Sequence, residues 1–187
     1  DVESILASLQ NGAESKVEET QKRTPQASPR LYDLTTLQRE ANNRFGMSAN
    51  RTLQVAQALY EKHKVITYPR TDSRALPEDY GSTCIGILKA IGGELQPHAE
   101  KVLENGWVAT GNRKIFNNKQ ISDHFAIVPT NQPKDLSGDD LKIYGMIVRR
   151  FIATFYPPAQ FDVTTRLTRL EEHTFKTEGK VLVEQSW

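Results

Sequence analysis

The spacing of the apolar residues changes along this chain of 187 residues, and that change limits the folds open to it. Between residues 34 and 45, and again between 137 and 155, apolar side chains recur every three or four positions, which predicts amphipathic helices. From Phe161 onward they alternate with polar side chains, which predicts a half-buried strand. Residues 15–23 are polar and alternating and could form an exposed strand. We therefore expect an α+β chain whose two β ends pair and whose helical centre is an insertion.

Two helices are expected at the start of the helical centre. In the first, Thr35 and Gln38 fit a capping box, and Gly46 ends the helix. Ser48 can cap the second helix. The β-branched residues 65–67 then predict a strand leading into residue 68. This order is typical of a helix-turn-helix followed by a wing, although most short helix pairs simply pack on each other.

The remaining elements are predicted from residues that typically begin or end helices and strands. Residues 1–10 can form a helix that ends at Asn11-Gly12, and residues 24–29 read as a linker. A helix is expected to start at residues 76–79, and others at Pro97 and Ser137, the last carrying an apolar stripe from Leu141 to Phe155. Adjacent Asp139 and Asp140 fit capping of that last helix. Two strands, residues 175–177 and 181–183, are expected to turn at Glu178-Gly179.

Composition excludes several classes of protein. No apolar run approaches the ~20 residues needed to span a bilayer, and no signal peptide is visible, so we expect no membrane partner. The single cysteine, Cys84, rules out an internal disulfide and a multi-cysteine zinc site, which favours a reducing, intracellular compartment. The net charge is only +1, but residues 30–74 hold eight Lys and Arg against four Asp and Glu. Positive charge is thus concentrated where a polyanion could bind, although basic helices are also commonly solvated surfaces.

The hexapeptide formed by residues 68–73 (YPRTDS) lies within this basic segment. Pro69 restricts the backbone, so Tyr68 is expected to end a strand in extended geometry, with Arg70 returning to the same side. A phenol, with a reference pKa of about 10, is a poor nucleophile until a nearby cation favours the phenolate. The same cation can bind the oxygens of a phosphate under attack. Attack by Tyr68 on a phosphodiester is one interpretation; a strand end with a surface arginine is the other.

Two further blocks accompany the hexapeptide: residues 31–42 (LYDLTTLQREAN) precede it, and residues 121–130 (ISDHFAIVPT) follow it. Together and in this order, the three blocks closely resemble the type IA DNA topoisomerases, specifically the topoisomerase III branch. The resemblance implies a central fragment of such an enzyme, with residues 30–156 as a mainly helical, winged-helix-like domain that carries the active-site tyrosine. Residues 1–29 and 157–187 would be the first and returning parts of a β-rich arch domain.

The resemblance also implies roles for individual residues. Tyr68 would be the nucleophile that becomes joined to a 5′ phosphate, and Arg70 would position the scissile phosphate and stabilise the transition state. Residues 71–73 would support them, although all three could be turn and cap residues. His124 matches the family histidine close to the tyrosine and would contact the phosphate or transfer a proton, although a lone histidine is more often structural.

As a whole, the resemblance implies transient cleavage, passage and religation of single-stranded or underwound DNA without ATP, in the bacterial cytoplasm at the nucleoid. The family's Mg²⁺-binding carboxylates reside in a separate domain that nothing here replaces, so we expect no metal bound by this fragment and no activity from it alone. Its partners would be DNA and the remaining topoisomerase domains. The competing interpretation is a non-catalytic winged-helix module that binds nucleic acid. A tyrosine recombinase or relaxase is a second enzyme alternative, but the Arg/His cluster or metal-binding histidines expected of those are not visible.

Overall fold

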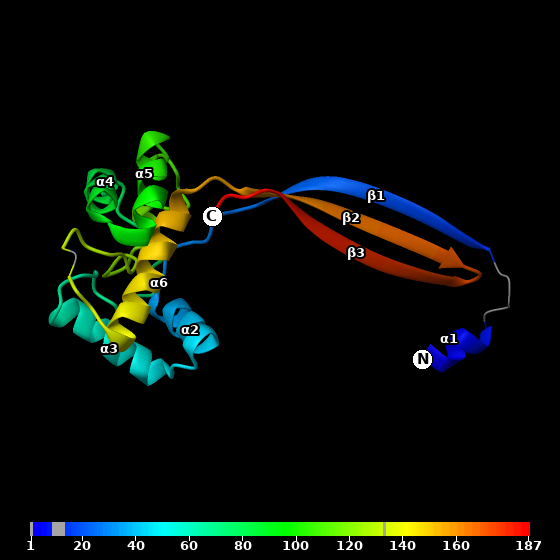
Figure 1. The fold of residues 1–187 in the computed structure, drawn as a ribbon, viewed down its shortest axis with the longest axis horizontal. Coiled ribbons are helices and arrows are strands. Elements are labelled where there is room, and N and C mark those ends of the chain that lie inside the picture. Colours follow the sequence, from blue (N-terminus) through cyan, green and yellow to red (C-terminus); the bar gives the residue numbers. More distant parts are fainter. Residues whose placement is uncertain (1, 9–13, 133) are drawn as a thin grey trace. The chain divides into compact units, whose positions relative to one another are not determined.

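The computed structural model describes residues 2–8, 14–132 and 134–187. The chain forms two compact units: Asp1–Ala27 with Pro158–Trp187, and Ser28–Pro157 (Figure 1). The first unit contains a three-stranded antiparallel sheet, and the second is mainly helical, so the chain is α+β, as predicted. Within the described residues, no helix is both long enough and apolar enough to cross a membrane.

The sheet unit joins the two ends of the chain. Strand β1 (Ser15–Gln26) pairs with β2 (Ala159–Leu170), and β2 pairs with β3 (His173–Glu184), so the strand order is β1-β2-β3. The prediction that β segments from the two ends pair is confirmed. The unit also contains helix α1 (Val2–Ser8); its predicted end at Asn11-Gly12 lies outside the described residues.

Two sequence predictions about the sheet were wrong. Residues 24–26 belong to β1 rather than to a linker, and Pro25 is opposite Gln160 in the register. An edge strand tolerates proline because its outward N–H makes no ladder bond. The strand β3 is also continuous through Gly179, which is paired with Thr164. The hairpin turn lies instead between Leu170 and His173, where Glu171 takes the positive φ of 51° without a glycine to signal it.

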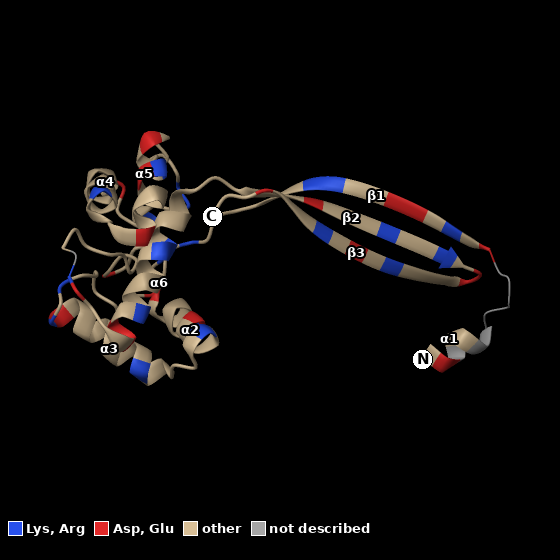
Figure 2. Cartoon of the chain, viewed as in Figure 1, with Lys and Arg blue, Asp and Glu red and all other residues tan. Residues whose placement is uncertain are grey.

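Charged side chains pair across neighbouring strands, and Figure 2 shows the two signs distributed along all three strands. Arg23 Nε lies 2.5 Å from Asp162 Oδ1, and Arg166 Nη2 lies 2.8 Å from Glu19 Oε2. Each pair joins residues directly opposite in the register of β1 and β2. Exposed pairs of this kind contribute only about 0–1 kcal/mol each, so they fix the register more than they stabilise the sheet.

The helical unit begins with α2 (Leu34–Phe45) and α3 (Ala49–Glu61), which pack on each other. The capping box of α2 is formed by Asp33 and Thr36, not by Thr35 and Gln38: the Thr36 N–H donates to Asp33 Oδ1 at 2.7 Å. An aspartate one position before the helix is the stronger cap. Gly46 ends α2 in the left-handed conformation, with φ of 65°, as predicted. Ser48 caps α3 by accepting from the Arg51 N–H, also as predicted.

The rest of the unit contains α4 (Gly81–Ala90), α5 (Gln96–Glu104) and α6 (Gly138–Phe155), with short 3₁₀ turns η1 (Gly93–Leu95) and η2 (Asn118–Gln120). The predicted helix start at residues 76–79 is a turn closed by the Tyr80 N–H on the Pro77 carbonyl at 3.0 Å. The α4 helix starts only at Gly81, where a Cβ would lie 2.4 Å from Thr110 Cγ2. In the apolar stripe of α6, Val148, Phe151 and Phe155 are buried and Tyr144 is partly buried, but Leu141 is 54% exposed and was wrongly assigned to it.

The helix α6 runs between two buried apolar clusters of the helical unit. One cluster surrounds Phe151 and Phe116 and includes residues of α4 and α5; the other surrounds Ile143 and includes residues of α2 and α3. Carboxylates at the start of α6 contact α3 and the residues after it: Asp139 accepts from Arg51 Nη2 at 2.9 Å, and Asp140 lies 3.1 Å from His63 Nε2. The α3 helix, which leads into the hexapeptide, therefore packs against both α2 and α6.

Candidate active site

The hexapeptide follows a short extended segment that pairs with residues 126–130. The Thr67 N–H donates to the Val128 carbonyl at 3.0 Å, and Thr67 Oγ1 donates to the Ala126 carbonyl at 2.9 Å. Ile66 and Pro129 form an isolated antiparallel bridge. Residues 65–68 therefore form an isolated bridge and not the strand that was predicted there. A ladder cannot extend toward residue 69 because Pro69 has no N–H to donate, and the Val128 N–H donates to Thr67 Oγ1 at 3.0 Å.

Tyr68 is partly buried, and its ring packs against two other rings. The centroid of the His124 ring lies 4.2 Å away at an interplanar angle of 42°, and that of Tyr60 lies 5.4 Å away at 82°. Lys64 Nζ in turn lies 5.5 Å from the centroid of the Tyr60 ring. Ring packing of this kind fixes the direction of the Tyr68 hydroxyl without using it in a hydrogen bond.

Arg70 is exposed and faces helix α3. With the Gln57 amide turned so that its oxygen faces the guanidinium, Gln57 accepts from Arg70 Nη2 at 2.9 Å and from Nε at 3.2 Å. Gln57 and Tyr60 are three positions apart on α3, so they share one face of that helix. Tyr68 and Arg70 thus lie against the same face of α3. Both side chains therefore contact α3.

Buried hydroxyls hold the backbone of the hexapeptide to the segment that carries His124. Thr71 Oγ1 donates to the His124 carbonyl at 2.8 Å and accepts from the Ser73 N–H at 3.0 Å. Ser73 Oγ donates to the Gln120 carbonyl at 2.8 Å. The Thr71 carbonyl in turn accepts from the Leu34 N–H at 3.0 Å, at the start of α2. Thr71 and Ser73 therefore support the loop through their hydroxyls.

The remaining polar residues of the motif lie at the solvent surface. Asp72 accepts from Ser122 Oγ at 3.3 Å, and both residues line a pocket of about 270 Å³ beside the hexapeptide, together with residues 119–121. His124 is also exposed. The structure brings the Tyr68 and His124 rings into contact and places Arg70 one helical turn of α3 away from the Tyr60–Tyr68 contact.

Sequence reasoning did not single out Gln57. The signal that could have found it is its position three residues before Tyr60, on the face of α3 that points to the hexapeptide. A polar side chain on an otherwise apolar face needs a hydrogen-bond partner, and here the partner is Arg70.

The residues around Tyr68 do not form a metal site. Across residues 2–8, 14–132 and 134–187, no three His, Cys, Asp or Glu side chains come together in a set that could hold a metal ion. The donors nearest in sequence to Tyr68 and His124, Asp72 and Asp123, belong to no such set.

Comparison with known proteins identifies the family. The family model described as DNA topoisomerase matches residues 1–187. The chain is 40% identical over 190 residues to DNA topoisomerase 3 of Bacillus cereus, covering 100% of this chain and 26% of that protein. It is 43% identical over 171 residues to DNA topoisomerase 3 of Shouchella clausii, covering 89% of this chain and 23% of that protein.

A solved structure agrees with these sequence matches. Full-length topoisomerase I from Thermotoga maritima superposes with a TM-score of 0.65 at 25% identity, over 98% of this chain and 30% of that one. The chain spans about a quarter of the length of the topoisomerase 3 relatives it matches. Because the family model covers the whole chain and the fold agrees, this chain belongs to the type IA DNA topoisomerase family.

Proposed function

We propose that this chain is the tyrosine-bearing part of a type IA topoisomerase, and that Tyr68 cleaves one DNA strand by forming a transient bond to a 5′ phosphate. The observation that carries the proposal is the packing of the Tyr68 ring against His124, at 4.2 Å between centroids, in a loop that also presents Arg70. The complete enzyme would act on single-stranded or underwound DNA, in the bacterial cytoplasm at the nucleoid.

In the proposed cleavage step, Tyr68 Oη attacks the phosphorus of a phosphodiester. The Oη–P bond forms and the P–O3′ bond breaks; the phenol proton is released and the departing 3′ oxygen gains one. Resealing is the reverse reaction, with the 3′ hydroxyl attacking the phosphotyrosine. Because the phosphoester energy is kept in the Oη–P bond, no nucleotide cofactor is needed.

Arg70 is proposed to bind the scissile phosphate through its planar guanidinium, which can hold two phosphate oxygens at once. Gln57 accepts from Nε and one Nη2 hydrogen, so further N–H groups of the guanidinium remain to donate to a ligand. Held from α3 in this way, the guanidinium is oriented before DNA binds, which is the condition for strong electrostatic stabilisation of a transition state.

His124 is proposed to assist by contacting the phosphate or by transferring the proton of the reaction. Its ring contacts that of Tyr68 and is exposed to solvent, so it can exchange protons with water. Its backbone carbonyl accepts from Thr71 Oγ1, which holds the histidine beside the tyrosine.

Cleavage is proposed to require the complete enzyme. The 187 residues alone are expected to leave supercoiled DNA unrelaxed even with Mg²⁺, because the metal-binding carboxylates expected in the family are not supplied by the described residues. Relaxation of supercoiled DNA by the purified 187-residue chain would show that the metal-binding carboxylates lie within this chain after all.

The test is the rate of cleavage of a single-stranded oligonucleotide by variants of the complete enzyme. We expect Tyr68→Phe to abolish cleavage, Arg70→Lys to impair it severely although charge is kept, and His124→Ala to cost less. The matched control is Tyr60→Phe, which removes a hydroxyl from the ring packed against Tyr68 and should retain cleavage. Retained cleavage in Tyr68→Phe, with DNA binding intact in every variant, would instead favour a non-catalytic role for this loop.

A further inference from the structure

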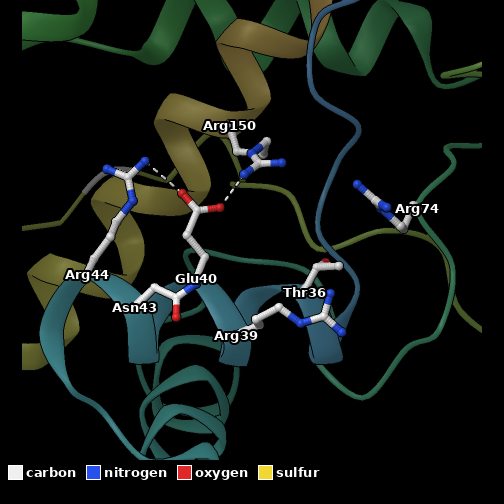
Figure 3. Close-up of a pocket in the computed structure, with 7 residues that line it drawn as sticks. All are labelled: Thr36, Arg39, Glu40, Asn43, Arg44, Arg74 and Arg150. Carbon is white, nitrogen blue, oxygen red and sulfur yellow. Dashed lines mark hydrogen bonds and ion pairs between the residues drawn. The ribbon is translucent and has the colours of Figure 1, made fainter. Parts of the chain in front are cut away.

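A second basic site lies beside α2. An open pocket of about 400 Å³ is lined by residues from α2, α6 and the loop that follows the hexapeptide (Figure 3). We call it the arginine pocket. Its lining holds four arginines against one glutamate, a formal charge of +3. The lining residues are Thr36, Arg39, Glu40, Asn43, Arg44, Arg74 and Arg150.

Glu40 neutralises only part of this charge. Its carboxylate pairs with Arg150 and lies 2.8 Å from Arg44 Nη2, and Figure 3 shows it projecting between these two arginines. Arg150 is also fixed by the carbonyl of Arg30 at 3.1 Å and by its position 4.3 Å from the centroid of the Tyr32 ring. Arg150 and Glu40 therefore build the wall of the pocket.

The other two arginines form no ion pair with Glu40. The Arg39 side chain is exposed and makes no hydrogen bond or ion pair with any residue of the described chain. Arg74 is partly buried and donates from Nε to the Leu31 carbonyl at 2.9 Å. Burial lowers the pKa of Arg74, the nearby charges of Arg30 and Arg150 act in the same direction, and Asp33 opposes them. A bound anion would favour the charged form of Arg74.

The pocket is connected to the hexapeptide through the backbone. Arg74 follows Arg70 by four positions, so their Cα atoms can be no more than about 14 Å apart. That distance is about four nucleotides of rise in B-form DNA. In addition, the Leu34 N–H at the start of α2 donates to the Thr71 carbonyl, so the helix that carries Arg39 is fixed to the reactive loop.

We propose that the arginine pocket binds a backbone phosphate of the cleaved DNA strand, within a few nucleotides of the phosphate held by Arg70. Guanidinium groups converging on an open, polar pocket are the arrangement that suits a phosphodiester, which they can bind in bidentate fashion. An acidic peptide could satisfy the same charges, but the short link to the hexapeptide favours the nucleic acid. The choice of the cleaved strand rests on the proposed function.

The experiment measures binding of a fluorescent single-stranded oligothymidylate to the complete enzyme across a series of KCl concentrations. The background is Tyr68→Phe, so that cleavage does not disturb the equilibrium. Arg39→Ala should reduce the slope of log K against log salt by about 0.7, the value for one phosphate contact on a single strand. Arg39→Glu should weaken binding further. The matched control is Arg149→Ala, which removes an exposed arginine of α6 outside the pocket and should leave the slope unchanged.

Equal slopes for Arg39→Ala and Arg149→Ala would overturn the proposal. So would binding of polyglutamate that depends on Arg39 while the DNA slope stays unchanged, because the pocket would then be an acidic-peptide site. A failure of the proposed function is seen separately. If the enzyme with Tyr68 intact forms no covalent adduct while Arg39→Ala still lowers the slope, the pocket binds DNA but the tyrosine does not cleave it.

Discussion

Replacing Thr71 with valine should loosen the loop that carries Tyr68 and Arg70. Valine has nearly the shape of threonine, so the substitution removes the hydroxyl while filling the same space. Thr71 is 8% exposed, and its hydroxyl donates to the His124 carbonyl at 2.8 Å and accepts from the Ser73 N–H at 3.0 Å. Both contacts are lost in the variant.

The two losses differ in size because their surroundings differ. Ser73 is 4% exposed, so its N–H is left in a place where water cannot easily replace the lost acceptor, at a cost of about 1–3 kcal/mol. The carbonyl belongs to exposed His124 and can be hydrated, so losing that bond costs about 1 kcal/mol. The sum predicts that Thr71→Val lowers the free energy of unfolding of the helical unit by roughly 2–4 kcal/mol.

The assay is urea unfolding of the 187-residue chain, followed by the circular dichroism of its helices. Thr71→Ser is the matched control, since it keeps the hydroxyl and loses only a methyl group worth about 0.8 kcal/mol. In the complete enzyme, Thr71→Val should also slow oligonucleotide cleavage more than Thr71→Ser does. If the two variants unfold within about 0.5 kcal/mol of each other, the hydroxyl does not hold the loop and the reasoning fails.

Three further outcomes are expected. Gln57→Ala should slow cleavage by the complete enzyme about 10-fold or more, because a hydrogen bond to a charged group contributes about 1.5–3 kcal/mol. Gln54→Ala on the same helix should leave the cleavage rate unchanged, and equal rates for the two variants would show that Gln57 does not support the site. The Cys84 thiol should resist alkylation at pH 8 until the chain is unfolded, because burial raises its pKa to about 12 and disfavours the thiolate. Rapid alkylation of the folded chain would contradict this. Gly46→Ala should lower the free energy of unfolding in urea by about 1 kcal/mol, because φ is 65° at this position and an alanine would be strained there although its Cβ meets no other atom. An unchanged urea midpoint would contradict this.

Much of the fold could be predicted because local rules and tertiary packing agree. Ser48 and Gly46 cap helices as expected, and α6 ends before Pro157. The failures occur where a residue adopts a conformation that its type does not signal. Glu171 takes a left-handed turn usually marked by glycine or asparagine, and Pro25 sits in a strand because that strand is at an edge.

The site was only partly visible in the sequence. The hexapeptide could be found because its residues are contiguous and their chemistry is readable in order. The contacts that position it could not, because they depend on which helix faces pack together. The Arg150–Glu40 pair that forms the wall of the arginine pocket joins residues 110 positions apart, and the arrangement of α2 against α6 that joins them is set by burial of the cluster around Ile143. No local pattern carries that information.

The most direct test of the account is to identify the residue that becomes bonded to DNA. The complete enzyme is trapped with a single-stranded oligonucleotide by rapid denaturation, digested with nuclease and trypsin, and analysed by mass spectrometry. Trypsin should release residues 65–70, between Lys64 and Thr71, as one peptide. The account predicts that this peptide carries a nucleotide joined through its 5′ phosphate to Tyr68, and that Tyr68→Phe yields no adduct. A nucleotide on any other residue, or one joined through a 3′ phosphate, would contradict it.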